Sequence, residues 1–123
     1  MNTTKEFTIA QTLKRLGVSP NWDGYGHLKT AMLLCLEDPS LLKQITSSLY
    51  PAIAKTHQSI PTRVERTIRH AIEAGCLRAD LEFFDEVFGY SLDPRRGKPT
   101  NGEFLATVAD YLKMTTQENT DGT

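Results

Sequence analysis

A helical repeat of apolar residues between Pro61 and Leu77 constrains the fold of this 123-residue chain more than any other feature. At about 100° per residue, one side of such a helix collects apolar and small side chains, and the other collects polar and charged ones. The first set is Val64, Ile68, Ala71, Ile72 and Gly75, and the second is Thr62, Arg63, Arg66, Arg69, His70 and Glu73. The pattern predicts a helix with one buried face and one face that carries three arginines.

Similar spacings recur along most of the chain, and no sustained alternation of apolar and polar residues indicates a strand. They predict further helices over residues 7–16, 27–37, 41–49, 51–57, 80–88 and 102–114. Residues 17–26 are expected to form a loop from which Trp22 and Tyr25 pack back onto the core. The predicted fold is all-α, with six or seven short helices in one domain over residues 1–114 and a flexible polar tail over residues 115–123.

The composition limits what such a domain can be. Apolar residues make up 39% of the chain and charged residues 24%, an ordinary balance for a globular domain with its own core. The longest strongly apolar run, residues 31–36, is far shorter than the ~20 residues that cross a bilayer, and no secretory signal is visible. We therefore expect a cytoplasmic protein without a membrane partner, in which Cys35 and Cys76 are buried thiols rather than a disulfide.

No motif typical of catalysis or of ligand binding is found in the sequence. His27, His57 and His70 are 30 and 13 residues apart, which matches no zinc-ligand spacing. A nucleophile motif and a glycine-rich phosphate loop are both missing. We therefore predict neither an enzyme nor a protein that holds a metal or another cofactor.

Charge is distributed unevenly, although the formal net charge is only −1. Residues 51–78 carry five basic and two acidic side chains, whereas residues 79–123 carry four basic and nine acidic ones. A cluster of cations in an otherwise acidic chain indicates a surface for nucleic acid. A solvated helix surface is the alternative, because Arg69 and Glu73 have the spacing of an i,i+4 ion pair.

The segment before the arginine-rich helix favours the nucleic-acid interpretation. A short amphipathic helix over residues 51–57 and a short polar turn lead directly into it. Two helices joined by a tight turn are typical of the helix-turn-helix, whose second helix enters the major groove of DNA. Arginine suits that helix because its planar guanidinium matches O6 and N7 of guanine and also binds phosphate. We expect a scaffold helix over residues 51–57 and a recognition helix over residues 61–77.

Four sequence motifs carry a closer resemblance. They are Tyr50-Pro-x-Ile-Ala-Lys, Arg63-Val-Glu-Arg-x-Ile-Arg-His-Ala-Ile-Glu, Phe88-Gly-Tyr and Lys98-Pro-Thr-Asn-x-Glu-Phe. With looser matches around them, the chain resembles the C-terminal DNA-binding effector domain of the stage 0 sporulation protein A family over roughly residues 8–113. This resemblance implies a six-helix, bacterial, nucleoid-associated domain that binds short promoter boxes on double-stranded DNA and regulates transcription. The family's receiver domain has no counterpart here, so the chain is either an excised domain or a paralogue without that switch.

The resemblance also implies roles for single residues. Positions that match or adjoin the base-reading residues of the family are Glu65, Arg66, Arg69 and His70. Positions that match its phosphate contacts are Thr62 and Arg63, and the loop cations Arg95, Arg96 and Lys98 are candidates for a second phosphate contact. Glu65 has an alternative role, because Thr62-Arg-Val-Glu65 has the spacing of a capping box at the start of its own helix.

The acidic helix over residues 80–88 is a candidate surface for a protein partner. Its outer side chains are predicted to be Asp80, Glu82, Asp85 and Glu86, and its inner ones Leu81, Phe84, Val87 and Phe88. The resemblance implies that this region contacts the RNA polymerase sigma subunit and that copies of the domain self-associate weakly on tandem DNA sites. A helical protein–protein adaptor that kept the fold without DNA affinity is the alternative function. A continuous positive stripe along residues 62–73 that reaches residues 95–98 would favour DNA binding.

Overall fold

The computed structural model describes residues 3–89 and 97–121 of the chain, with side-chain environments for residues 4–89 and 97–115. Its α-helices are α1 (Thr3–Arg15), α2 (Asp23–Glu37), α3 (Tyr50–His57), α4 (Pro61–Cys76), α5 (Leu81–Phe88) and α6 (Asn101–Asp121). Two short turns of other helical types lie between α2 and α3, a 3-10 turn, η1 (Pro39–Lys43), and a π-helical turn, η2 (Ile45–Leu49). The predicted all-α class is confirmed, and no strand occurs among the described residues.

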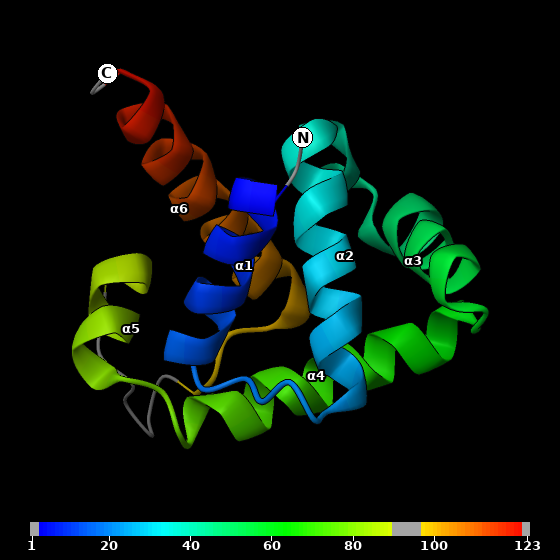
Figure 1. The fold of residues 1–123 in the computed structure, drawn as a ribbon. Helices are drawn as coiled ribbons and strands as arrows, with labels where there is room; N and C mark the ends of the chain where they lie inside the picture. The colour runs from blue at the N-terminus through cyan, green and yellow to red at the C-terminus, as the bar shows by residue number, and fades with distance from the viewer. Residues whose placement is uncertain (1–2, 90–96, 122–123) are drawn as a thin grey trace.

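The helix α4 lies across one side of the molecule, as Figure 1 shows, with α1 and α2 standing above it and α3 and α5 near its two ends. Contacts join α2 to α1, α3, α4 and α6, so α2 is the central element of the packing. The predicted inner residues of α4, Val64, Ile68, Ala71, Ile72 and Gly75, are all buried. They share the core with the buried side chains of α6, Phe104, Leu105, Val108, Ala109 and Leu112. The apolar periodicity of the sequence therefore predicted the core face of α4 correctly.

Close backbone contact fixes the position of α4 against the N-terminal half of the chain. A Cβ atom on Gly24 would overlap the carbonyl oxygen of Thr67 and lie 2.7 Å from Cβ of Ala71. At the other end of α4, a Cβ on Gly75 would lie 3.0 Å from the carbonyl oxygen of Leu16. Only glycine permits these approaches without moving the backbone, so α2 and the α1–α2 loop hold α4 at a defined depth.

The segment between α2 and α3 differs from the prediction. Residues 41–49 do not form one regular α-helix, because the chain leaves helical geometry at Gln44, with φ −137° and ψ 48°. The Asp38 carboxylate accepts a hydrogen bond from the Ser40 backbone N–H at 3.1 Å, which starts the 3-10 turn at Pro39. Periodicity gives the buried side of such a segment but does not distinguish an α-helix from tighter and wider turns.

Three helix boundaries also differ from the prediction. The helix α1 begins at Thr3, before the predicted start at residue 7. The helix α2 begins at Asp23 instead of His27, and Trp22 takes the extended conformation that precedes it. A carboxylate in the first turn suits the positive end of the helix dipole, which favours the earlier start. The last helix continues to Asp121, beyond the predicted end at Met114, and no proline or glycine interrupts the sequence over that stretch.

The inner face of α5 is also shifted from the prediction. Leu81 is 65% exposed, and Phe83, which was not assigned to the inner face, is buried beside Phe84. The Asp80 carboxylate caps the helix by accepting from the Phe83 backbone N–H at 3.2 Å. The ring of Phe83 packs edge-on against Tyr111 with centroids 5.6 Å apart. The cap and the Tyr111 ring thus turn Phe83, not Leu81, toward the core.

The two cysteines are free and buried, as the sequence predicted. Burial raises the pKa of Cys35 to about 11 and raises the pKa of Cys76 as well, so both thiols stay protonated at neutral pH. Trp22 and Tyr25 pack against the core as expected. Within the described parts of the chain, none of the helices is both long and apolar enough for a membrane span.

Candidate nucleic-acid interface

A three-residue turn joins α3 to α4. Gln58 follows α3 in the left-handed conformation, with φ 54°, and the Ser59 backbone N–H donates to the Ala54 carbonyl at 2.8 Å. Ile60 is extended, and Pro61 occupies the first position of α4, where its fixed φ suits a helix start and no backbone hydrogen bond is lost. The two helices pack against each other. This arrangement is consistent with a helix-turn-helix.

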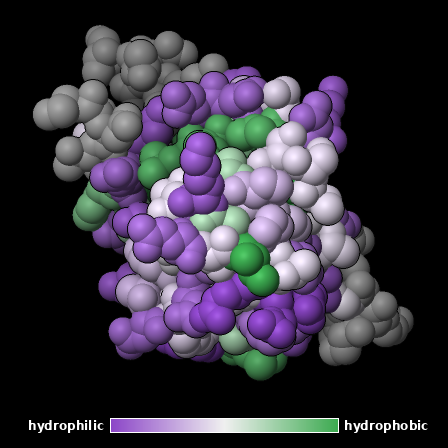
Figure 2. Space-filling model, turned by 90° about the vertical axis from the view of Figure 1, so that its right-hand side faces the viewer, coloured by the Kyte–Doolittle hydropathy of each residue, from purple (hydrophilic) through white to green (hydrophobic). Residues whose placement is uncertain are grey.

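The surface around this turn is mainly polar. Figure 2 views the molecule from the side on which α3 lies, and hydrophilic or intermediate residues cover most of the face that it shows. Among the described residues of α4, the predicted outer side chains Thr62, Arg63, Arg66, Arg69, His70 and Glu73 are all exposed. We refer to Arg63, Arg66 and Arg69 together as the arginine face. The division of α4 into a buried and an exposed face is as the sequence predicted.

The three arginines differ in their partners. Arg63 forms an ion pair with Asp23 of α2, with 3.4 Å between Nη2 and Oδ2, and both side chains are more than half exposed. Arg69 donates from Nε to Oε2 of Glu65 at 3.1 Å, and this hydrogen bond raises the pKa of the guanidinium. Among the described residues, Arg66 has no ion-pair or hydrogen-bond partner. Solvent-exposed ion pairs are weak, so the guanidinium groups of Arg63 and Arg69 can exchange their present partners for others.

Glu65 does not cap its helix, so the capping-box alternative is wrong. The residue that precedes the first turn of α4 is Ile60, and no side chain caps that turn. Because Pro61 starts the helix one residue before Thr62, Glu65 lies too far along to reach the backbone N–H groups at the helix start. Its carboxylate binds Arg69 instead.

A capping box does occur at the start of α6, where the sequence analysis missed it. The Thr100 backbone N–H donates to Oε1 of Glu103 at 2.9 Å, and the Glu103 backbone N–H donates to Oγ1 of Thr100 at 3.1 Å. The spacing Thr100-Asn-Gly-Glu103 is the signal that would have revealed it.

The candidate loop cations are only partly described. Arg95 and Arg96 lie outside the described residues. Lys98 is exposed and lines a surface hollow of about 570 Å³ together with Glu65 and Arg69. The end of this loop therefore lies beside the exposed side of α4, as a shared surface would require.

An amide group missed in the sequence connects three helices at this hollow. Nδ2 of Asn101, the first residue of α6, donates to the Tyr50 hydroxyl of α3 at 2.9 Å and to the Glu65 carbonyl of α4 at 3.1 Å. Tyr50 is buried, and burial raises the pKa of its phenol above the ordinary value. We call this pair of bonds the amide bridge. Asn101 belongs to the sequence motif that begins at Lys98. The two partners of its amide lie 51 and 36 residues away in the chain, so the motif alone does not reveal them.

A buried histidine holds α4 from the opposite flank. Nδ1 of His27 lies 2.6 Å from Oγ1 of Thr67, which itself donates to the Val64 carbonyl at 3.1 Å. The short contact ties His27 of α2 to the middle of α4. Burial is the main cause that lowers the pKa of His27, and the nearby His57 lowers it further.

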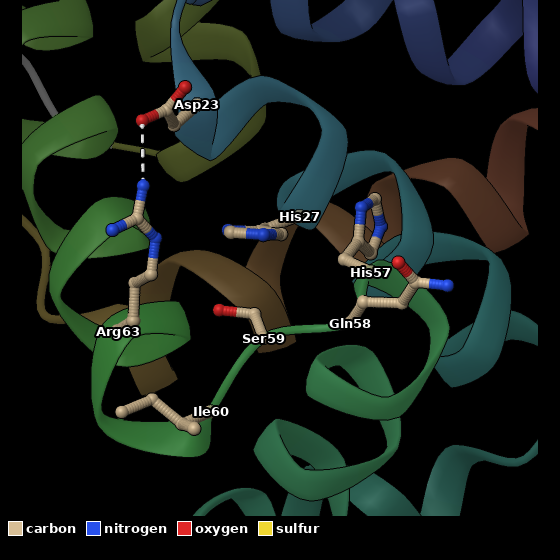
Figure 3. Close-up of a pocket in the computed structure, with 7 residues that line it drawn as sticks. All are labelled: Asp23, His27, His57, Gln58, Ser59, Ile60 and Arg63. Atoms are coloured by element: carbon tan, nitrogen blue, oxygen red, sulfur yellow. Dashed lines mark hydrogen bonds and ion pairs between the residues drawn. The ribbon is translucent and has the colours of Figure 1, made fainter.

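The other side of the His27 ring faces an open hollow of about 610 Å³ beside the α3–α4 turn. Figure 3 shows the ring between Arg63 and His57, with the Asp23–Arg63 ion pair at one edge of the hollow. His57 meets His27 edge-on, with ring centroids 4.8 Å apart, and its Nε2 lies 2.8 Å from Oγ1 of Thr30. Neither histidine was a candidate site residue in the sequence analysis, and both contribute to the support of the α3–α4 turn.

The acidic residues of α5 are exposed, and we refer to Asp80, Glu82, Asp85 and Glu86 as the acidic face. Asp80 caps the helix and lies 3.9 Å from the Arg15 guanidinium. Glu86 accepts a hydrogen bond from the Tyr111 hydroxyl at 3.3 Å. Among the described residues, Glu82 and Asp85 have no such partner, so their carboxylates have no competing contact within this part of the chain.

Comparison with known families supports the resemblance found in the sequence. The family model described as sporulation initiation factor Spo0A C terminal matches residues 9–112. The match covers every element from α2 to α5 and most of α1 and α6. This family consists of DNA-binding regulatory domains that act in sporulation.

Proposed function

The chain belongs to the Spo0A C-terminal family of DNA-binding domains, and we propose that it is a sequence-specific transcription regulator that inserts α4 into the major groove of promoter DNA. The observation that carries this proposal is the arginine face, which projects from a helix whose other side is buried, directly after a three-residue turn. In a helix-turn-helix, the second helix lies in the major groove, and its exposed side chains contact base edges. Promoter DNA as the target implies a place in the bacterial cytoplasm.

Base reading falls to the middle of α4 in this proposal. Arg66 has no competing partner among the described residues, so its guanidinium is available for a bidentate contact to guanine. Glu65 and Arg69 approach DNA as an ion pair that is 3.1 Å apart. On binding, the carboxylate accepts from an amino group such as cytosine N4, and Arg69 turns to a base or a phosphate. His70 follows on the same exposed side.

Phosphate contacts flank the base-reading residues. Thr62 and Arg63 in the first turn of α4 are assigned to one DNA strand, and Lys98, with Arg95 and Arg96, to a second contact. The proximity of Lys98 to Arg69 at a shared hollow supports this second group. Such contacts fix the orientation of the domain and supply most of its salt-dependent affinity.

The acidic face is assigned to a protein partner, the RNA polymerase sigma subunit. Its support is the exposure of Glu82 and Asp85 on a helix separate from α4, which leaves them accessible while α4 is on DNA. Copies of the domain are proposed to associate weakly on tandem sites rather than as a stable dimer in solution. Sedimentation of the free protein at micromolar concentration should therefore give a monomer, and a tight dimer would contradict this assignment.

Selection of binding sites from random duplex DNA at two salt concentrations tests the proposal. We expect a defined sequence to emerge. The logarithm of the affinity should fall linearly with the logarithm of the salt concentration, with a slope of roughly −0.9 for each phosphate neutralised. Affinity that is insensitive to both sequence and salt would contradict the proposal. That outcome would favour the helical protein–protein adaptor instead.

A further inference from the structure

The amide bridge joins α6 to both helices of the α3–α4 pair. We propose that Asn101 is a positioning residue for DNA recognition, which fixes α4 relative to α3 and thereby sets the base specificity of the domain. Asn101 is not assigned to contact DNA in this proposal. The inference rests on the proposed function, because it concerns the helix that carries the base-reading residues.

The bonding capacity of an amide explains why one side chain can hold two helices. Nδ2 carries two protons in a rigid plane, and one bond goes to the Tyr50 hydroxyl and the other to the Glu65 carbonyl. A carbonyl oxygen has two lone pairs, so that of Glu65 accepts the amide in addition to its bond within the helix. Removal of the amide leaves the buried phenol of Tyr50 and the Glu65 carbonyl without this donor.

The bond from Asn101 to the Glu65 carbonyl lies next to the residues proposed to read DNA bases. Glu65 contributes the carbonyl to the bridge and is followed directly by Arg66, which has no partner among the described residues. Two residues after Glu65, Thr67 contacts His27 from the other flank of α4. The turn that carries the base-reading side chains is thus held on both flanks, from α6 and from α2.

Asn101 is itself rigidly held. The Thr100–Glu103 capping box fixes the backbone on either side of it, and Phe104 and Leu105 of the next turn are buried. Because the backbone on both sides of Asn101 is fixed in this way, its amide stays in one position, and α3 and α4 must fit to it. The same short segment places Lys98 at the hollow that Glu65 and Arg69 of α4 also line.

A comparison of specific and non-specific binding separates positioning from simple stabilisation. Asn101→Ala and wild type are titrated with the duplex selected from random DNA and with a scrambled duplex at one salt concentration. Because the bridge sets geometry at base edges, we expect affinity for the selected duplex to fall ~5-fold, about the value of one hydrogen bond. Affinity for the scrambled duplex and the salt slope should remain unchanged, since phosphate contacts tolerate small shifts.

Two further variants control the experiment. Gln11→Ala removes an exposed amide of α1 and should bind both duplexes as wild type does. Tyr50→Phe deletes one acceptor of the bridge without changing the ring, so it should show a smaller loss of the same kind, and it tests the proposal even if Asn101→Ala unfolds. Equal losses on both duplexes, or no loss in either variant, would overturn the proposal. If wild type itself lacks sequence preference, the proposed function fails with it. If wild type has that preference and Asn101→Ala keeps it at the same size, the positioning role alone is overturned.

Discussion

The arginine face of α4 and the acidic face of α5 carry opposite charges, and they are built differently. Two of the three arginines already have carboxylate partners, Asp23 and Glu65, whereas Glu82 and Asp85 have none among the described residues. The helix α4 is also held by glycine contacts, a buried histidine and the amide bridge, whereas α5 packs mainly on α6. A surface that must match DNA geometry needs support on every side. A surface that attracts a charged partner needs exposure more than accuracy.

The support under the arginine face can be broken at a single glycine. Gly24→Ala places a Cβ against the carbonyl oxygen of Thr67, a backbone atom that cannot rotate away. We expect a loss of about 2–3 kcal/mol in the free energy of unfolding, measured with urea. Gly26→Ala, two residues along the same helix, meets only the His57 ring at 3.4 Å and should be neutral or gain up to ~1 kcal/mol. Equal effects of the two changes would mean that this close approach does not position α4.

Substitutions on the arginine face and on the acidic face should have different effects on DNA binding. Arg66→Ala removes the guanidinium that has no partner within the described part of the chain. The change should cost ~1–3 kcal/mol of specific binding and relax the preference at one base position. Thermal stability should change little because Arg66 is exposed. Glu82→Gln on the acidic face is the matched control and should leave the selected sequence unchanged. A loss of base preference in Glu82→Gln would show that α5 also approaches DNA.

Within the arginine face, position along α4 should distinguish base contacts from phosphate contacts. Arg63→Ala is expected to weaken all duplexes alike and to lessen the salt slope by about one unit. Titrations of the selected and scrambled duplexes over several salt concentrations measure both quantities. A change in base preference with an unaltered slope would instead make Arg63 a base reader.

The smallest expected effect is a pH dependence of stability that arises at His27, one of the supports of α4. His27 is buried near His57, Asp23 and Arg63, and its pKa is lowered in the folded state, first by burial. Below about pH 6.5, the ordinary histidine pKa, the unfolded chain therefore binds more protons, and stability falls as pH decreases toward the lowered value. Urea unfolding at pH 7.5 and 5.5 should show a smaller acid loss in His27→Gln than in wild type. His70→Gln, at an exposed position, is the control and should lose as much stability at pH 5.5 as wild type does. An equal loss of stability in His27→Gln would contradict the role of His27 in this pH dependence.

The parts of the molecule that the sequence predicted are those governed by local periodicity. Val64, Ile68 and Ile72 recur at helical spacing, so the buried face of α4 could be found without a structure. The supports of α4 could not be found in this way, because Asn101 and His27 bind partners 36 to 51 residues away. No local pattern distinguishes such residues from ordinary exposed amides or histidines. Leu81 and Phe83 were misassigned for a related reason, since a side-chain cap and the ring of Tyr111 determine which of them turns inward.

The ion pair between Arg63 and Asp23 gives the domain an intramolecular counterion. A phosphate that approaches Arg63 displaces a carboxylate rather than a dissolved anion, and the displaced carboxylate stays beside the DNA, where it repels the same backbone. A contact of Arg63 with a phosphate therefore carries the same offset on every DNA sequence. In the proposed binding mode, the surface acid on α2 thus lowers the affinity for all duplexes alike and leaves the base preference to the middle of α4.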